Sequence, residues 1–442
     1  MRSLLRTAGC TLIAMLAIAS LAAQPPAPAP LTPDDLFDPN TVQDISLTIS
    51  PRDWQELKEH FRENVYYPAN LTWRGEIVRN IGIRSRGLGS RSDTKPGLRL
   101  DFDKYTSSQE FLGLKSLVLD NQTQDPAMLK ERVVMRFYRE MGIPAPRVVH
   151  ARLFVNNEFA GLYTIVESID KDFLKRSFGE NDGYLYEFHY TDRYGFEYLG
   201  PELERYAPYF EPKTHEHDSM MSLYRPIKEL AWTVSESSDS LFVPSMNEYL
   251  DLRMFLTYIA VENFLADHDG VLGDWGMNNF YLYRFEEKLL SQLVPWDKDS
   301  SFLRVDYNIW ANMEANTLTK RAMKEPSLQA AYLEALRRCA ELAMRLPEPA
   351  PEAQRRKVTG APEARWLERE VSFIYSQIRG IAEVDALKPF TTEQFEDEIA
   401  KVLEFSRSRS DYVLQEIDRA DLRGSARSPS RRPSGTAPFR NR

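Results

Sequence analysis

The chain has 442 residues, a formal net charge of −9 and a hydrophobic content of 43%. This length is sufficient for two or three compact units with extensive cores. The negative balance excludes a sequence-independent nucleic-acid binder, because such proteins need a basic face.

The N-terminus is typical of an export signal. Arg2 and Arg6 give a positive start, Leu12–Ala19 forms an apolar run, and Ser20–Ala23 is a small-residue cleavage site. The apolar run is too short and too rich in alanine for a membrane span. We therefore expect an exported protein, periplasmic or extracellular, without stable membrane insertion. Cleavage would leave Cys339 as the one cysteine and so exclude an intramolecular disulfide.

Strand patterns dominate the chain after a proline-rich linker. Asp44–Ser50 alternates with the period of a strand, and the next segment begins like a capped helix. Two more strand patterns occur at residues 79–87 and 97–102, on either side of a polar loop that contains glycine. This half of the chain is expected to form a sheet-based lobe.

A helix is predicted between the first strands and a later hairpin. Asp125 is the expected N-cap, Pro126 the first helical residue, and Gly142 marks the end. Two strand patterns follow at residues 147–157 and 158–168, and the asparagine-rich turn between them predicts a hairpin.

The second half of the chain is largely helical. Residues 247–266 are apolar on most sides and predict one buried helix, and Thr391 with Gln394 forms a capping box before a late helix. The fold class expected is therefore α+β, with a strand-rich lobe and a helical lobe. The expected divisions are a signal peptide at 1–23, a linker at 24–43, an N-lobe at 44–168, a C-lobe with a helical C-terminal extension at 169–422 and a disordered basic tail at 423–442.

The densest polar segment runs from Ala266 to Phe302. A loop with several aspartates leads to Asn279, and two strand patterns joined by a short turn then lead to Asp297. A hairpin of this kind brings Asn279 close to Asp297. Amide and carboxylate oxygens are ligands that Mg²⁺ or Mn²⁺ prefers. Solvated turn residues are the alternative explanation.

The order of these side chains is similar to the layout of protein kinases. There a catalytic-loop aspartate accepts the hydroxyl proton, an asparagine holds one metal ion, and an aspartate after a hairpin also binds metal. The aspartate precedes the asparagine by five residues in kinases, and Asp274 and Asn279 have this spacing.

Motifs in four segments together resemble the CotH kinase family, which is named after a spore-coat protein. The resemblance covers about residues 45–305, and the motifs lie at residues 82–102, 129–179, 269–283 and 294–302. It implies a bilobal, atypical protein-kinase-like fold that binds ATP with Mg²⁺ or Mn²⁺ and phosphorylates Ser or Thr of a protein substrate.

The resemblance also implies roles for individual residues of the C-lobe. Asp297, in "PWDKD", matches the metal-binding aspartate, and Asn279 matches the second metal ligand. Asp269, in the "DG" of the loop, matches the catalytic aspartate, whereas Asp274 is the alternative that the spacing favours. Asp269 is preferred.

In the N-lobe, Lys95 matches a family lysine expected on the phosphates, although Pro96 departs from the family pattern. Arg99 is the alternative cation, because a guanidinium binds phosphate well. Glu131 resembles the helix glutamate that pairs with this cation, and Glu167 resembles the position that leads into the hinge beside the adenine.

Other polar residues have simpler explanations. Arg84 and Arg86 are equally consistent with a solvated strand face. The chain has no Gly-x-Ser-x-Gly and no His-Glu-x-x-His sequence, so a hydrolase interpretation lacks a nucleophile or a zinc motif.

The sequence thus predicts an exported, metal-dependent atypical protein kinase. The alternative is a non-catalytic, kinase-like binding or structural protein of the cell envelope or coat. Two observations motivate this alternative: export takes the protein to where ATP is scarce, and Pro96 alters the segment of Lys95. A metal-dependent phosphotransferase acting on sugars or other small molecules is a third possibility.

Overall fold

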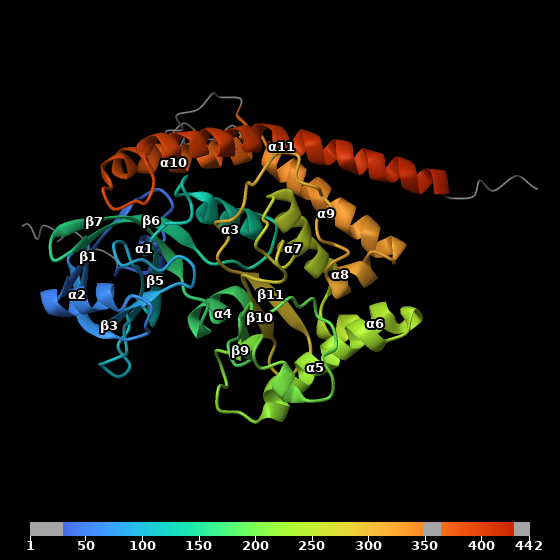
Figure 1. Ribbon diagram of the computed structural model, residues 1–442, viewed down its shortest axis with the longest axis horizontal. Coiled ribbons are helices and arrows are strands. Elements are labelled where there is room, and N and C mark those ends of the chain that lie inside the picture. The colour runs from blue at the N-terminus through green and yellow to red at the C-terminus, as the bar shows by residue number, and fades with distance from the viewer. Residues whose placement is uncertain (1–29, 348–363, 428–442) are drawn as a thin grey trace, which may run out of the picture.

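A computed structural model of the chain describes residues 30–347 and 364–427 (Figure 1). Within these ranges two hydrophobic cores form. The mixture of strands and helices confirms the α+β class. The expected export signal, the first part of the linker and residues 428–442 lie outside the described residues.

The first core fills a closed barrel with the strand order β1-β2-β3-β4-β5-β7-β6. Its strands are β1 (Gln43–Ile49), β2 (Tyr67–Trp73), β3 (Glu76–Arg86), β4 (Gly97–Asp101), β5 (Ser116–Asp120), β6 (Val148–Val155) and β7 (Glu158–Glu167). Side chains alternate between the two faces of a strand, so Leu98 and Leu100 of β4 are buried while Arg99 points outward. The N-terminal lobe is thus a barrel, in which β1 and β6 close the sheet in parallel.

Part of the predicted linker belongs to this lobe. Helix α1 (Pro33–Leu36) lies within the segment predicted as a linker, and Leu36 and Phe37 are buried in the barrel core. The linker prediction for residues 24–43 is therefore wrong over its second half, because these two apolar side chains have a core to enter. Helix α2 (Pro51–Glu59) begins as predicted, with Ser50 as its N-cap.

Helix α3 (Lys130–Glu140) starts later than predicted. The carboxylate of Asp125 accepts hydrogen bonds from the backbone N–H groups of Ala127, Leu129 and Lys130. It therefore holds a turn ahead of the helix instead of being the N-cap, and Met128 in this turn has a positive φ of 54°. The helix ends as expected before Gly142, which has a φ of 80°.

The second core surrounds a four-stranded sheet with the order β11-β10-β8-β9. Its strands are β8 (Tyr184–Phe188), β9 (Phe210–Pro212), β10 (Phe280–Arg284) and β11 (Ser291–Pro295), and its helices are α4 (Lys171–Phe178), α5 (Met220–Glu236), α6 (Asp239–Tyr249), α7 (Leu252–Phe264), α8 (Thr317–Ala322) and α9 (Pro326–Met344). The single helix predicted for residues 247–266 is wrong. The chain leaves the helical conformation at Leu250, and Asp251 then caps α7 by accepting from the N–H groups of Arg253 and Met254.

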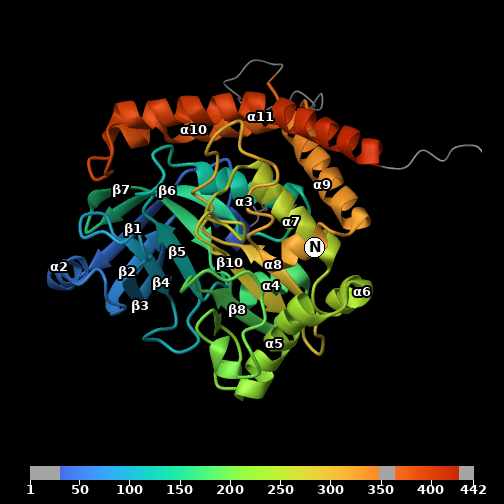
Figure 2. The ribbon, with the colours of Figure 1, turned by 45° about the vertical axis from the view of Figure 1, so that its right-hand side comes forward.

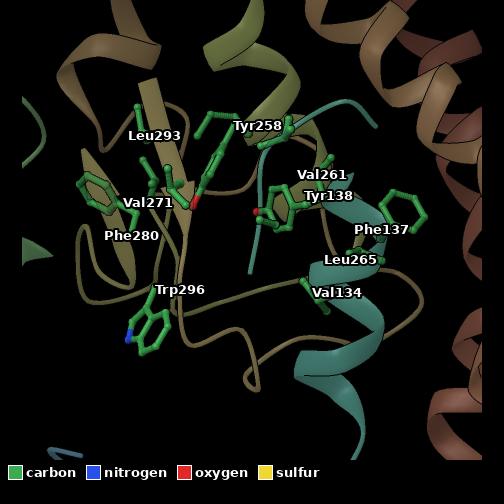
Figure 3. Packing of buried hydrophobic residues seen from close by; sticks show 14 of the residues in the cluster. Val134, Phe137, Tyr138, Tyr258, Val261, Leu265, Val271, Phe280, Leu293 and Trp296 are labelled. Atoms are coloured by element: carbon green, nitrogen blue, oxygen red, sulfur yellow. The ribbon is translucent and has the colours of Figure 1, made fainter. Parts of the chain in front are cut away.

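Helix α3 connects the barrel with the second core. Phe137 of α3 stacks on Phe264 of α7 with ring centroids 5.4 Å apart, and Tyr138 lies 5.1 Å from Tyr258. Figure 3 shows these side chains of α3 beside α7, with the strands that carry Phe280 and Leu293 beyond. Helix α3 therefore couples the position of the barrel to that of the second core.

Two long helices complete the described chain. Helices α10 (Trp366–Val384) and α11 (Thr392–Arg427) lie along one side of the molecule, from the barrel to α9 (Figures 1 and 2). The predicted capping box is confirmed, since the N–H of Gln394 donates to Thr391 and the Thr391 N–H donates to the Gln394 side chain. Helix α11 continues to Arg427, so the first residues of the predicted tail at 423–442 are helical. In residues 30–347 and 364–427, no helix is both long and apolar enough to span a bilayer.

Arg409 of α11 is the basis of a stability prediction. Its guanidinium is fully buried and donates to the carbonyl oxygens of Asn263, Phe264, Val305 and Tyr307, at 2.6–2.8 Å. Arg409→Met removes these donors and leaves buried acceptors without partners. We expect the free energy of unfolding in urea to fall by about 3 kcal/mol.

Arg407→Met is the matched control on the same helix. Arg407 is about half exposed and pairs with Glu368, so its loss should cost no more than about 1 kcal/mol. Equal losses for the two variants would contradict the structural role of Arg409.

Candidate functional site

A cleft of about 480 Å³ lies between the barrel and the second sheet. Its apolar surface comes from Val118, Ile169, Tyr281 and Trp296. Its charged lining comprises the cations Arg84, Arg86, Arg99, Lys115, Lys171 and Lys213 and the acids Asp101, Asp103, Asp170, Asp172, Glu187 and Glu216. An apolar surface beside several guanidinium and ammonium groups suits a flat ring that carries phosphate groups.

Asp269 is held in one orientation by two asparagines. The amide nitrogen of Asn278 donates to its Oδ1 at 3.1 Å, and that of Asn279 donates to its Oδ2 at 3.0 Å. Burial raises the pKa of Asp269, and the hydrogen bond from Asn278 opposes this shift. The catalytic role of Asp269 stays a prediction.

Asp274 lies elsewhere on the same loop. Its side chain is 49% exposed, accepts a hydrogen bond from Asn312 at 3.0 Å and lies 3.8 Å from His268. The two alternative catalytic acids therefore have different surroundings, and of the two it is Asp269 that contacts Asn279.

The hairpin of β10 and β11 brings Asn279 near Asp297. Phe280 pairs with Pro295, and one residue further the N–H of Trp296 donates to the carbonyl oxygen of Asn279 at 3.2 Å. Asn279 and Asp297 have positive φ angles of 56° and 50°. Such angles are uncommon outside glycine and are often found at functional sites.

Four carboxylates, which we call the acid cluster, gather beside the cleft: Asp120, Glu131, Asp297 and Asp299. Burial raises the pKa of Asp297 to about 6, and the Asp120 and Asp269 carboxylates add to the shift. Burial, followed by the neighbouring acids, also raises the pKa values of Glu131 and Asp299 well above their usual range. The cluster thus concentrates negative charge that the folded protein alone does not fully compensate.

Arg86 links the acid cluster to the cleft. It lines the cleft, its Nη1 lies 3.4 Å from Oδ2 of Asp120, and its guanidinium lies over the Trp296 ring at 5.4 Å. Burial lowers the pKa of Arg86, but Asp120, Asp297 and Glu131 outweigh burial and raise it. No site role for Arg86 was predicted from the sequence. Ile83 and Ser85 of β3 are buried, and Arg86 lies on the opposite face of this strand, where it lines the cleft.

Lys298, between the two aspartates of "DKD", points into the protein. It is fully buried, and its ammonium lies 2.8 Å from Glu262 and 3.0 Å from Asp267. Burial alone would lower the pKa of Lys298, but these two carboxylates raise it. Glu262 also accepts from the N–H of Val271, so this ion-pair triad joins the loop of Asp269 to the segment of Asp297.

Lys95 and Glu167 make other contacts. Nζ of Lys95 lies 2.7 Å from Oδ2 of Asp385, and the lysine is 1% exposed. The carboxylate of Glu167 is shared by Arg147 and Arg176. Among the described residues that line the cleft neither Lys95 nor Glu167 occurs, whereas Arg99 does. The nucleotide-binding roles of Lys95 and Glu167 stay predictions, and the contacts of Lys95 favour an arginine on the phosphates.

The oxygen atoms near Asp297 fit a hard divalent cation. Glu131 is 5% exposed, and the carboxylates of Asp120, Asp297 and Asp299 add to the burial that raises its pKa, while Arg86 opposes the shift. A divalent cation beside Asp297 would offset this concentration of carboxylates. Close groups of three acid or histidine side chains occur in the described residues at Glu56–Glu59–His60 and at Glu187–His189–Glu211, and both groups are largely exposed.

The sequence of the chain matches a known family. Residues 83–413 match the family model described as CotH kinase protein. The chain is thus a kinase-like protein. It belongs to the CotH kinase family, as the motifs indicated.

Two relatives illustrate this membership. Inner spore coat protein H of Bacillus subtilis (strain 168) is 23% identical over 385 residues, which cover 84% of this chain and 96% of the relative. Spore coat protein homolog 1 of Rhizopus delemar is 20% identical over 324 residues, or 68% of this chain, and this chain spans about half the length of that relative, 51%.

Among solved structures, a Helicobacter pylori proinflammatory kinase, CtkA, matches 76% of this chain and 94% of its own, with 10% identity and a TM-score of 0.28. The golgi casein kinase matches 85% of this chain and 77% of its own, with 9% identity and a TM-score of 0.26.

The acid cluster leads to a prediction about stability. Because the pKa of Asp297 rises from 3.8 to about 6 on folding, its charged form destabilises the folded state above pH 6, and this penalty disappears as the pH falls toward 4. Asp297→Asn should therefore raise the free energy of unfolding by about 1 kcal/mol or more at pH 8 without divalent cations, and much less at pH 4.5.

Thermal unfolding at several pH values in a chelating buffer measures this effect. Asp397→Asn, an exposed position on α11, is the control and should show no such pH-dependent gain. A variant of Asp297 that is less stable than the wild type at pH 8 would contradict the arrangement of the acid cluster.

Proposed function

We propose that this chain is an exported, atypical protein kinase that transfers the γ-phosphate of ATP to Ser or Thr of a protein substrate and depends on Mg²⁺ or Mn²⁺. The observation that carries the proposal is the cleft that Arg86 and Trp296 line, with Asp297 next to Trp296 in the chain. Asn279 lies near Asp297 across the hairpin and donates a hydrogen bond to the carboxylate of Asp269. Within this proposal, we take residues 44–168 as an N-lobe and 169–422 as a C-lobe of a bilobal kinase-like fold.

The nucleotide would lie in the cleft between the lobes. Val118 and Ile169 on the barrel side and Tyr281 on the other offer apolar contacts to the base. Arg86 and Arg99 would contact the phosphates, because a guanidinium keeps its charge and donates two parallel hydrogen bonds. Of these, Arg99 is the alternative to Lys95 that the sequence analysis proposed.

The chain's own carboxylates and amides would hold the divalent cation. Asn279 and Asp297 would supply the oxygen atoms, and the buried carboxylate of Glu131 lies near Asp297. When bound, the cation supplies positive charge that offsets the charge of the phosphates and of the acid cluster.

Asp269 would orient the acceptor hydroxyl. Its carboxylate is half-buried and held by Asn278 and Asn279, so it can accept the hydroxyl hydrogen in a fixed direction. Most of the catalytic effect would come from positioning and electrostatics, as is general for phosphoryl transfer.

Comparing Asp269→Asn with Asp274→Asn tests this assignment. The rate of ³²P transfer from ATP to a protein acceptor in the presence of Mn²⁺ should fall about 100-fold or more for Asp269→Asn. It should change severalfold at most for Asp274→Asn, because this exposed side chain bonds to Asn312 through an oxygen that asparagine retains.

Equal melting temperatures show that both variants are folded. Full activity of Asp269→Asn would exclude it as the residue that orients the hydroxyl, and loss of activity in Asp274→Asn alone would transfer the role to Asp274.

A second candidate is a non-catalytic, kinase-like protein of the cell envelope or coat. The ion pair between Lys95 and Asp385 favours it, since this lysine is not available to phosphate in the present arrangement. The names of the two relatives, both called spore coat proteins, are consistent with it. Absence of ³²P incorporation together with no thermal shift on adding ATP and Mn²⁺ would favour this candidate over the kinase.

A further inference from the structure

The helices α10 and α11 and the turn between them, residues 366–427, form what we call the C-terminal strap. Both ribbon views show the strap along one side of the molecule, from the barrel to the helices of the second core (Figures 1 and 2). Its described contacts reach three segments that surround the candidate site.

The first contact is with α3, the helix that carries Glu131. Nζ of Lys130 lies 2.8 Å from Glu398 of α11 and 3.7 Å from Asp125. Six residues further along α3, Arg136 donates a hydrogen bond to Glu370 of α10. Because Lys130 and Glu131 are adjacent, the ion pair with the strap sits directly beside the acid cluster.

The second contact is with the barrel. Asp385, in the turn of the strap, accepts from Nζ of Lys95 at 2.7 Å and from the N–H of Leu162 at 2.9 Å. The neighbouring Gly161 has a φ of 120°, and a Cβ there would lie 2.8 Å from the Asp385 carboxylate. The barrel backbone is therefore shaped to admit this aspartate.

The third contact is with the chain that follows Asp299. Phe405 of α11 packs edge-to-face on Phe302 with ring centroids 5.1 Å apart. Arg409 bonds to the carbonyl oxygens of Val305 and of Phe264, at the end of α7. One rigid element thus holds α3 on one side of the cluster and the segment after Asp299 on the other.

We propose that the C-terminal strap fixes Glu131 relative to Asp297, with Glu398 and Asp385 as positioning residues that act through Lys130 and Lys95. This inference rests on the proposed kinase function of the same site. According to this inference, the chain's own C-terminal helices determine the position of α3.

The charge distribution around Lys130 supplies the physical reason. Its ammonium has Glu398 on the side of the strap and Asp125, with the charge of Asp299, on the side of the site. Without the charge of Glu398, the pull of the acids on the site side is no longer balanced. The start of α3 then moves with Lys130, and Glu131 moves with it.

Glu398→Gln tests the proposal, with Glu393→Gln as the control. Glu393 is an exposed residue of the same helix, so both variants lose one charge from α11. We expect Glu398→Gln to accelerate amide hydrogen exchange in residues 130–136 about fivefold or more, with β10 and β11 unchanged, and to weaken the binding of Mn²⁺–ATP by calorimetry by a similar factor. Glu393→Gln should leave both quantities at the wild-type values.

Asp385→Asn provides a second variant from the barrel side. Asparagine retains an oxygen acceptor for Lys95 and Leu162, which limits the loss of stability. We expect the same direction of change in α3 exchange and in nucleotide affinity, since the strap loses its charged anchor on the barrel.

The outcomes are distinct. Unchanged exchange in residues 130–136 for both variants overturns the positioning role, and faster exchange with unchanged nucleotide affinity overturns its link to the site. If the wild-type protein binds no ATP, the kinase proposal fails, while the exchange measurement still decides whether the strap sets α3. Uniformly faster exchange throughout the chain identifies the strap as a general stabiliser and also overturns the proposal.

Discussion

A buried lysine joins the two loops on which the candidate site depends. Lys298 turns into the protein and contacts the carboxylates of Glu262 and Asp267, while the aspartates on either side of it stay half-buried beside the cleft. Removing one partner of a buried ion pair typically costs several kcal/mol, because the remaining charge is left uncompensated. The positions of Asp269 and Asp297 are thus tied to each other by electrostatics as well as by the hairpin.

In the acid cluster, unlike around Lys298, the negative charges are not fully compensated by neighbouring cations. Asp297 and Asp299 both raise the pKa of Glu131, and Arg86 opposes this shift. Arg86 and Lys298 oppose the rise of the Asp297 pKa but do not cancel it. Such repulsion lowers the stability of the folded state and is retained only where the surrounding structure over-determines the geometry. In this protein the carboxylates are held in place by the packing of α3 on α7, by the ion pairs of Lys298 and by the helices of the strap. A bound cation would relieve this repulsion. Without one, the stability of the rest of the fold must offset the free energy that the repulsion costs.

Local patterns predicted much of this arrangement. Strand patterns identified β1, β3, β4, β6, β7, β10 and β11 but not β2, β5, β8 and β9. The capping box identified the start of α11, and a short hairpin placed Asn279 near Asp297. The start of α3 was missed because Asp125 bonds to N–H groups through a turn that includes a residue with positive φ. The partner of Lys95 was missed because Asp385 lies 290 residues further along the chain, and no local period carries information about such a pair. The closure of the barrel was missed for the same reason, since it depends on the non-local pairing of β1 with β6.

The stretch "WDKD" combines these effects in four consecutive residues. Trp296 packs on Tyr281 and supports the guanidinium of Arg86, which accounts for a large aromatic residue at the end of a strand. Asp297 adds its charge to the cluster, and Lys298 anchors the segment in the core. The lysines Lys95 and Lys298 hold buried ion pairs, whereas Arg86 lines the cleft. A guanidinium suits that place, because it stacks on an aromatic ring while its N–H groups remain directed at carboxylate or phosphate.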